Sequence, residues 1–400
     1  MHTNNHLLKL FHISPTPMEH SIWYIILITL SSCATLKALF NHLQTPYKKL
    51  PPGPVLIPII TSFQWLRKSF ADLEPTLINL KRKYGPIITL SIGHRKFILI
   101  TSSILVHQAL IQNGAIFADR PPPSETLKIN SSNQHNISGA SYGPLWRLLR
   151  RNLTLYILHP SKIKSFSPAR KWVLNMIEKS IQKESNSGHD PVLVGTDTTS
   201  TALQWVMANL VKHQELQSKL YDEIRTLDSD LDEIQEENLK KLSYLKAIIL
   251  EGLRRHPPGH FVLPHAVTQD VTLDGYIIPK EAIVNVMVAE IGWDPKVWED
   301  PTVFKPERFL NQHNGMLNEE LSDVTGNKEV NMIPFGAGRR MCPAFGLAML
   351  HLEYFVVNFI KEFKWTAKVG DDIDLSEKQE FTTVMKYPLW AHVSPREEED

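Results

Sequence analysis

Residues 334–344 read Pro334-Phe335-Gly336-Ala337-Gly338-Arg339-Arg340-Met341-Cys342-Pro343-Ala344 and form a glycine-rich loop ahead of a long apolar helical pattern at 347–363. The loop presents a lone cysteine, Cys342, close to the start of that predicted helix. A helix N-terminus carries partial positive charge, and arginines stand nearby, so both stabilise a thiolate over a thiol. One thiolate does not supply the ligands of a zinc site, which normally has four. The loop therefore predicts a thiolate with a role other than zinc binding.

A single thiolate is sufficient to hold one haem iron. Thiolate ligation also pushes electron density onto the iron, which favours cleavage of an O–O bond. Cys342 is therefore a candidate axial ligand in an oxygen-activating haem enzyme. The alternative is a buried structural thiol, a common state of free cysteines. Cys33 is the only other cysteine, so the chain has no disulfide framework and fits a reducing compartment.

The composition limits the class of protein further. The chain has 400 residues, a length typical of two or three domains or of one large fold. Its hydrophobic fraction of 42% is ordinary for a globular protein, and its formal net charge of +1 argues against a nucleic-acid partner. The 17 histidines are scattered and include no His-Glu-x-x-His pattern. We expect most of them on the surface or in packing roles.

The segment 21–40 differs from the rest of the chain. It carries one charge, Lys37, and its 20 residues would just span the hydrocarbon layer of a bilayer as a helix. Two lysines follow it and a glutamate precedes it, which by the positive-inside rule places the bulk of the chain in the cytosol. A cleaved signal peptide is the alternative. We expect a lumenal extension at 1–20, a transmembrane anchor at 21–40, a proline-rich hinge at 41–55 and one large domain at 56–400.

Periodicity predicts a mostly helical fold with small sheets, in the α+β class. Helices are expected at 72–84, 103–113, 145–155, 167–183, 190–211, 213–227, 239–255 and 347–363, with a loop at 120–140. Strands are expected at 87–92, 96–101, 271–273, 276–278 and 381–389. The first two are expected to form a hairpin around Gly93-His94-Arg95, and the next two a hairpin around Asp274-Gly275. The helix at 190–211 is predicted to begin at Asp190-Pro191, because an acidic N-cap followed by proline suits a first turn.

Four further motifs have spacings that suit one site. Glu251-x-x-Arg254 lies on a predicted helix, where residues three apart share a face and can pair. Pro306-Glu307-Arg308-Phe309 follows a proline-rich turn, and Trp146-x-x-x-Arg150 places two side chains on one helix face. Gly195-Thr196-Asp197-Thr198-Thr199 sets hydroxyls beside a carboxylate. Each motif alone could be a solvated surface, and their order ahead of Cys342 makes them informative.

Together these motifs resemble the cytochrome P-450 family, plant microsomal members above all. The loop Phe335-x-x-Gly338-x-Arg340-x-Cys342 is similar to the haem-binding signature of that family. The resemblance implies a haem b with Cys342 as the axial ligand of its iron, and with Phe335 and Gly338 in the loop that approaches the porphyrin. Further side chains are expected at or near the haem propionates: Trp146, Arg150, His265 and Arg340.

The resemblance also implies roles for the other motifs. Glu251, Arg254 and Arg308 are expected to form a buried network that holds the cysteine loop, since buried charges must satisfy one another. Asp197 and Thr198 are expected on a long central helix. There the threonine hydroxyl would bond to a carbonyl one turn back and open a notch for O₂, and both residues would relay protons.

The implied activity is insertion of one O₂-derived oxygen atom into a small apolar organic substrate. Electrons would come from NADPH through a membrane-bound reductase, at the endoplasmic reticulum membrane with the catalytic domain in the cytosol. Segments 258–263 and 381–385 are candidate walls of the substrate pocket, because both carry apolar side chains.

The chain departs from the family near 184–190, where it is polar although an apolar helix is expected. Trp146 and Asp197 are 51 positions apart, and relatives would carry roughly a hundred more residues there. The missing part would include helices that roof the pocket and the first half of the central helix. The alternative to an active enzyme is a truncated, non-catalytic, membrane-anchored form that still binds haem. Haem-thiolate chemistry without O₂ is a third reading, which Asp197 and Thr198 disfavour.

Overall fold

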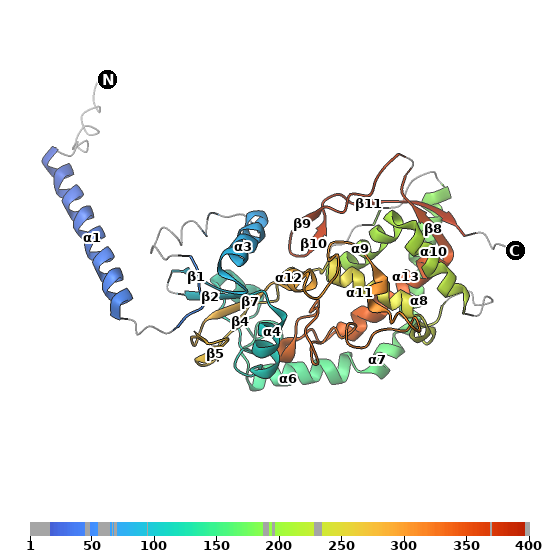
Figure 1. The fold of residues 1–400 in the computed structure, drawn as a ribbon, viewed down its shortest axis with the longest axis horizontal. Helices are drawn as coiled ribbons and strands as arrows, with labels where there is room; N and C mark the ends of the chain where they lie inside the picture. The colour runs from blue at the N-terminus through green and yellow to red at the C-terminus, as the bar shows by residue number, and fades with distance from the viewer. Residues whose placement is uncertain are drawn as a thin grey trace, which may run out of the picture. The chain divides into compact units, whose positions relative to one another are not determined.

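Helix α1 (Pro17–Gln44) belongs to the first of two units, residues 1–50 and 51–400 (Figure 1). The structure is a computed structural model that describes residues 17–44, 49–54, 65, 67, 70–93, 95–186, 192–193, 197–227, 234–368 and 370–396. The helix predicted at 21–40 is present and extends beyond both predicted ends. Its apolar side chains from Ile22 to Ile28 are exposed. In the described part of the chain, no helix combines the length and the apolar character that crossing a membrane requires.

The second unit contains a four-stranded sheet. Its strands, in spatial order, are β1 (Ile87–Ile92), β2 (Arg95–Ile100), β7 (Ile283–Val286) and β4 (His265–Ala266). β2 pairs antiparallel with β1 and parallel with β7, and β7 pairs antiparallel with β4. The first predicted hairpin is confirmed. Gly93 forms its turn with a φ of 61°, a left-handed conformation that glycine adopts without a Cβ clash.

Five helices build the main hydrophobic core of this unit, which Figure 1 shows at the end opposite the sheet. They are α8 (Ser167–Asn186), α9 (Thr198–Lys212), α10 (Gln214–Arg225), α11 (Ser243–Arg255) and α13 (Phe345–Glu362). α9 contacts both α11 and α13, and nearly all of its side chains after Thr201 are buried. Gly252 of α11 permits the close approach, because a Cβ there would lie 2.5 Å from Cγ2 of Val206 on α9. On the sheet side, α3 (Phe70–Tyr84) contacts β1.

Short helical segments connect the sheet to this core. They are α4 (Ser103–Val106), η1 (His107–Gln112), α5 (Glu125–Asn130), α6 (Pro144–Asn152), η2 (Leu153–Ile157) and α7 (Pro160–Ser165). The loop predicted at 120–140 is wrong in part, because α5 forms inside it. Ser124 begins that helix as its N-cap, and its hydroxyl accepts the N–H of Leu127 at 3.3 Å.

Small two-stranded sheets and short helices complete the unit. β5 (Val271–Leu273) and β6 (Tyr276–Ile278) form the second predicted hairpin, with Asp274 and Gly275 at positive φ in its turn. The other pairs are β9 (Glu377–Gln379) with β10 (Thr383–Met385), β11 (Leu389–Trp390) with β3 (Val192–Leu193), and β12 (His392–Pro395) with β8 (Phe363–Thr366). The short helices are α12 (Val288–Gly292), η3 (Asn238–Lys241), η4 (Pro306–Phe309) and η5 (Gly338–Arg340). The predicted mostly helical fold with small sheets is confirmed.

The helix predicted to open at Asp190-Pro191 is wrong at its start. Those two residues lie outside the described part, but Val192 and Leu193 form β3 and pair with β11. α9 begins only at Thr198. The two-residue strand uses its backbone groups in a sheet, so they are not available to a helix.

Candidate functional site

The cysteine loop at 334–344 is tightly folded. The N–H of Cys342 donates to the carbonyl of Phe335 at 2.9 Å, and that of Met341 donates to the carbonyl of Gly338 at 3.1 Å. Gly338 has a φ of 68°, and a Cβ at this position would lie 1.9 Å from the carbonyl oxygen of Leu110 in η1. Only glycine fits that contact. The loop thus holds the half-buried Cys342 shortly before α13 begins at Phe345.

Helix α6 brings Arg150 to this loop. Its Nη1 donates to the carbonyl of Met341 at 2.7 Å, next to Cys342. Burial lowers the pKa of Arg150, and the negative charge of a Cys342 thiolate acts in the opposite direction. The two motifs that the sequence analysis related to a haem site are therefore in contact.

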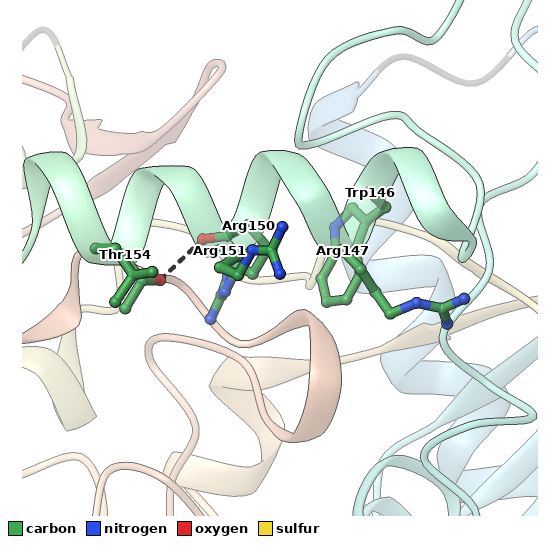
Figure 2. Close-up of a pocket in the computed structure, with 6 residues that line it drawn as sticks. Trp146, Arg147, Arg150, Arg151 and Thr154 are labelled. Carbon is green, nitrogen blue, oxygen red and sulfur yellow. Dashed lines mark hydrogen bonds between the residues drawn. The ribbon is translucent and has the colours of Figure 1, made fainter.

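A hollow of about 450 Å³ lies along α6 and η2 (Figure 2). Half of its lining residues are arginines, and the full set is Trp146, Arg147, Arg150, Arg151, Thr154 and Leu155. Figure 2 shows Arg147 on one turn and Arg150 and Arg151 on the next turn of one continuous helical stretch. The Thr154 hydroxyl bonds to the carbonyl of Arg150 at 2.9 Å. The hollow places a dense positive charge beside the loop that carries Cys342.

Arg340, Trp146 and His265 meet at the other end of the loop. The Arg340 guanidinium stacks over the Trp146 ring at 4.6 Å, and its Nε donates to the carbonyl of Ala118 at 2.6 Å. Nδ1 of His265 contacts the neighbouring carbonyl of Phe117 at 2.6 Å. The structure therefore gathers these predicted propionate residues around one short segment, 117–118.

Sequence reasoning missed Arg120, which belongs to the same group. Its Nη1 donates to the carbonyls of Leu263 at 2.8 Å and Pro264 at 2.7 Å, directly before His265. It stood at the edge of a predicted loop, and no spacing marked it. Its distance in sequence from the other motifs means that only the folded chain reveals its place.

The positive charges in this cluster repel one another, which makes each of them harder to keep when buried. Burial first, and then repulsion by Arg340, lower the pKa of Arg120 to about 10. Burial also lowers the pKa of Arg340 to about 10, with Arg150 adding to the effect and Asp119 opposing it. Burial and then Arg120 lower the pKa of His265 to about 3, although its bond to a carbonyl acts the other way. Asp119 is the one carboxylate that these shifts identify, so the cluster suits a ligand with more than one negative charge.

Glu251, Arg254 and Arg308 form a buried ion network. Arg254 meets both carboxylate oxygens of Glu251 at 2.7 and 2.8 Å, and Nε of Arg308 reaches the same carboxylate at 3.1 Å. The side chains of Glu251 and Arg254 are completely buried, and that of Arg308 is 7% exposed. The backbone N–H of Lys305 adds a further bond to Glu251 at 2.8 Å. Every charge is therefore paired, as burial demands.

The network fixes the chain between 292 and 308. Arg254 donates to the carbonyls of Gly292 at 2.6 Å and Pro301 at 2.8 Å, and Arg308 donates to that of Glu299 at 2.7 Å. Both guanidinium groups also lie over the ring of Trp298, whose Nε1 donates to the carbonyl of Asn331 at 3.2 Å. This chain of contacts runs from α11 to the segment directly before the cysteine loop.

Asp197 and Thr198 do not lie inside a long helix. Asp197 is the N-cap of α9, where its carboxylate accepts the N–H of Ser200 at 3.3 Å and the Ser200 hydroxyl bonds back. Thr198 is the first residue of α9, and both side chains are exposed. The predicted position of both residues inside a long central helix is therefore wrong. The predicted notch would use the carbonyl of a residue one turn before the threonine, which lies outside the described part. The preceding residues Gly195 and Thr196 lie outside the described part.

The helices before this point expose apolar side chains. The exposed set on α6, η2, α7, α8 and their connections includes Leu148, Leu155, Tyr156, Ile157, Phe166, Trp172, Val173 and Met176. Within α8, Trp172 is 63% exposed whereas Leu174 is 1% exposed. So many large apolar groups on neighbouring short segments indicate a face that another element would cover.

A comparison with protein families decides what this arrangement is. The model of the cytochrome P450 family, written here as P-450, matches residues 51–194 and 190–390. The chain belongs to the cytochrome P-450 family. It is therefore by family a monooxygenase that acts on small organic molecules, with a haem held by a cysteine thiolate and electrons delivered by a redox partner.

Two plant P-450 proteins and one solved structure illustrate the relationship. The chain is 36% identical to cytochrome P-450 89A9 of Arabidopsis thaliana, over 94% of this chain and 99% of that protein. It is 26% identical to an isoflavone 3'-hydroxylase of Medicago truncatula, over 93% and 97% of the two proteins. Its structure is similar to a zebrafish cytochrome P-450 solved with progesterone, with a TM-score of 0.68 and 20% identity over 82% of this chain and 100% of that one. At this identity the likeness shows the fold.

The comparison with the Arabidopsis P-450 also measures the internal gap. The alignment spans 512 positions, but 94% of 400 residues is about 376, so about 136 positions have no counterpart in this chain. The two matches of the family model meet at 190–194. This junction coincides with β3 and with the delayed start of α9. The place where the two matches meet agrees with the predicted deletion near 184–190.

The residues present fit the haem of a P-450. The loop offers a thiolate beside Arg150, and a Cβ on Gly336 would meet nothing within 4 Å, so this side of the loop is open. Haem carries two propionates, and the cationic cluster around Arg120 and Arg340 has a single carboxylate nearby. The charge pattern and the donor set therefore both suit the cofactor.

Proposed function

We propose that this protein is a haem-thiolate monooxygenase that inserts one O₂-derived oxygen atom into a small apolar organic substrate. Electrons would come from NADPH through a reductase. The observation that carries the proposal is the contact between Arg150 and the carbonyl of Met341, which joins two family motifs 191 positions apart at Cys342. Bound haem supplies the iron at which O₂ is activated, with the thiolate as electron donor.

The residues around Cys342 have separate roles in holding and orienting the haem. Cys342 holds the iron, and Phe335 and Gly338 set the loop's close turn. Cationic and aromatic side chains orient the propionates: Trp146, Arg150, His265 and Arg340, with Arg120 beside them. For Arg340 and His265 this requires the side chains to exchange or share their present carbonyl partners. The positioning residues are Glu251, Arg254 and Arg308. They hold the segment before the loop and do not touch the loop itself.

The experiment that tests the proposal is the absorption spectrum of the reduced, CO-bound protein after haem is supplied. We expect the red-shifted Soret band that thiolate ligation produces. Cys342→Ser is expected to abolish this band, because a serine oxygen does not provide the same electron donation. Cys33→Ser is the matched control and is expected to leave the band unchanged, since Cys33 lies in α1 of the other unit. A shifted band that survives in the Cys342→Ser protein would refute the assignment.

We infer that α1 attaches the protein to the membrane of the endoplasmic reticulum, with the domain at 56–400 in the cytosol. Support comes from its exposed apolar side chains, such as Trp23 at 64% and Ile28 at 64%. Expression without residues 1–50 tests the inference. The shortened protein should move from the membrane pellet to the soluble fraction, and equal sedimentation of both forms would contradict a role for α1.

A second candidate function is a haem-binding form without monooxygenase activity. It is favoured by the position of Asp197 and Thr198 at the exposed start of α9, outside the long central helix on which a proton relay was predicted. The exposed apolar face of α8 also favours a form without monooxygenase activity, because a pocket open to water does not exclude solvent from the reaction. The two candidates separate in one assay. A protein that shows the thiolate band but no NADPH-driven turnover with a reductase and a panel of apolar substrates is the second form.

A further inference from the structure

A buried acid–histidine cluster lies where three distant chain segments meet. It consists of Glu74 on α3, His256 and His260 after α11, and Glu377 and Gln379 on β9. Nδ1 of His260 lies 2.8 and 2.9 Å from the two carboxylate oxygens of Glu74. Nδ1 of His256 lies 2.9 Å from Oε1 of Glu377. The haem site described above uses none of these residues.

Nδ1 of His260 contacts two different segments. Besides the carboxylate of Glu74, it lies 2.8 Å from Nε2 of Gln379, which also donates to Glu74 at 3.0 Å. Nε2 of His260 is the other ring nitrogen. It is buried and has no hydrogen-bond partner in the described part of the chain, and it lies 3.4 Å from Oε2 of Glu377.

The His260 ring lies between two carboxylates. The charged and titratable groups around the ring are Glu74 from α3, Glu377 from β9, and Arg255 and His256 at the end of α11. The ring therefore joins α3 to β9 inside the cluster.

A hairpin connects the cluster to α9 and carries one of the two predicted pocket walls. β9 carries Glu377 and Gln379 into the cluster, and β10 pairs with β9. Between the two strands, Thr382 contacts Thr201 of α9 at 3.3 Å, and the N–H of Thr383 donates to the carbonyl of Pro258 at 2.8 Å. Phe381 at the turn is 93% exposed. The two candidate pocket walls, 258–263 and 381–385, are thus joined to each other and to the cluster.

We propose that His260 is a positioning residue that, by bridging Glu74 and Glu377, holds the β9–β10 hairpin against α9 and so sets which apolar substrates fit. The inference rests on the proposed function, because it takes 258–263 and 381–385 as pocket walls. Loss of the bridge releases the hairpin, and with it Phe381, while the haem-side residues keep their contacts. A hairpin that is no longer held against α9 should accept a broader range of ligand sizes.

The first test measures hydrogen–deuterium exchange of residues 377–385 in the full-length protein. His260→Gln and Glu377→Gln should each raise exchange at least about tenfold, since a charge-assisted hydrogen bond is worth at least that factor. Glu380→Gln is the matched control, because it lies on the same hairpin and pairs only with exposed Lys378.

The second test uses haem-loaded protein and spectral titration with azoles of increasing size. The ratio between the affinities for the smallest and the largest azole should fall at least about tenfold in Glu377→Gln relative to Glu380→Gln, by the same hydrogen-bond estimate. Equal exchange in the variants and the control overturns the proposal, as does a loosened hairpin with an unchanged ranking. If the protein takes up no haem, the proposed function fails, and the exchange of the hairpin still decides the role of His260.

Discussion

The cysteine-loop region and the junction region respond differently to the internal gap. The cysteine-loop region comprises the loop 334–344, α11 and the chain at 292–308, and its charges are buried and paired. The junction region comprises residues 184–201 and the exposed apolar faces of α6 to α8, and α9 begins there with an exposed cap. The first region takes its contacts from segments on the C-terminal side of the gap and from α6, so the loss of about 136 aligned positions leaves them intact.

The comparison shows that the two regions differ within one chain. The residues predicted to hold the haem keep close contacts with each other, whereas the residues predicted to relay protons lie at the exposed start of a helix. The junction is nevertheless joined to the rest of the unit, since β3 pairs with β11 and the Ser185 hydroxyl bonds to the carbonyl of Val393 at 2.7 Å.

The largest expected effect is at Glu251. Glu251→Ala leaves Arg254 and Arg308 buried without their carboxylate, so we expect a loss of about 3–5 kcal/mol in the free energy of unfolding. Glu299→Ala is the control, because the Glu299 side chain is 81% exposed and its ion pair with Lys305 is long, at 3.6 Å. Urea unfolding followed by circular dichroism measures both. Similar midpoints for the two variants would show that the cysteine-loop region does not depend on the network.

The second effect concerns pH and links stability to haem. Folding lowers the pKa of His265 from 6.5 to about 3, so the folded state disfavours its protonation. The stability that neutral His265 contributes is complete above about pH 6.5 and is lost as pH falls towards 3. In haem-free protein, His265→Gln should therefore reduce the fall in thermal midpoint between pH 7 and pH 5.

Haem should weaken the same pH dependence, because propionates near His265 would favour the imidazolium. Thermal midpoints with and without haem, measured at several pH values, test this point. If haem leaves the difference between the unaltered protein and His265→Gln unchanged, His265 does not face the propionates.

A smaller effect is expected at the start of α9. Asp197→Ala removes the N-cap and should cost about 1 kcal/mol in the free energy of unfolding. Thr198→Ala should change it by less than about 0.5 kcal/mol, because the side chain is exposed. Neither variant should alter the reduced CO spectrum. A change in that spectrum with Thr198→Ala would restore a role for the residue at the haem and would contradict the separation of the two regions.

The smallest effect on stability is expected on the exposed face of α8. Trp172→Lys should change the free energy of unfolding by less than about 0.5 kcal/mol and reduce self-association and dye binding, because the ring is mostly in solvent. Leu174→Lys is the contrasting variant on the same helix and should unfold the protein, since Leu174 is 1% exposed. Light scattering and ANS fluorescence follow both. Strong destabilisation by Trp172→Lys would show that this face is covered within the protein.

The local motifs were predictable to the extent that they depend on neighbours in sequence. The hairpins at β1–β2 and β5–β6 follow from strand patterns around turn residues, and α11 and α13 follow from helical periodicity. The start of α9 was not predictable in this way. Asp190-Pro191 has good capping chemistry, but Val192 and Leu193 pair with β11 across almost 200 residues, and a local rule does not see such a partner.

The family could be recognised from the sequence alone, and the residues of the haem site could be predicted from it, because thiolate, glycine and arginine chemistry at fixed spacing needs no tertiary context to be recognised. Only the tertiary structure decided that Arg120 joins the cationic cluster and that His260 lies between two carboxylates. It also showed that Asp197 caps a helix instead of sitting inside one. The physical reason is that burial and pairing of charge depend on which distant segments meet, and a gap of about 136 aligned positions changes those meetings without changing the motifs on either side.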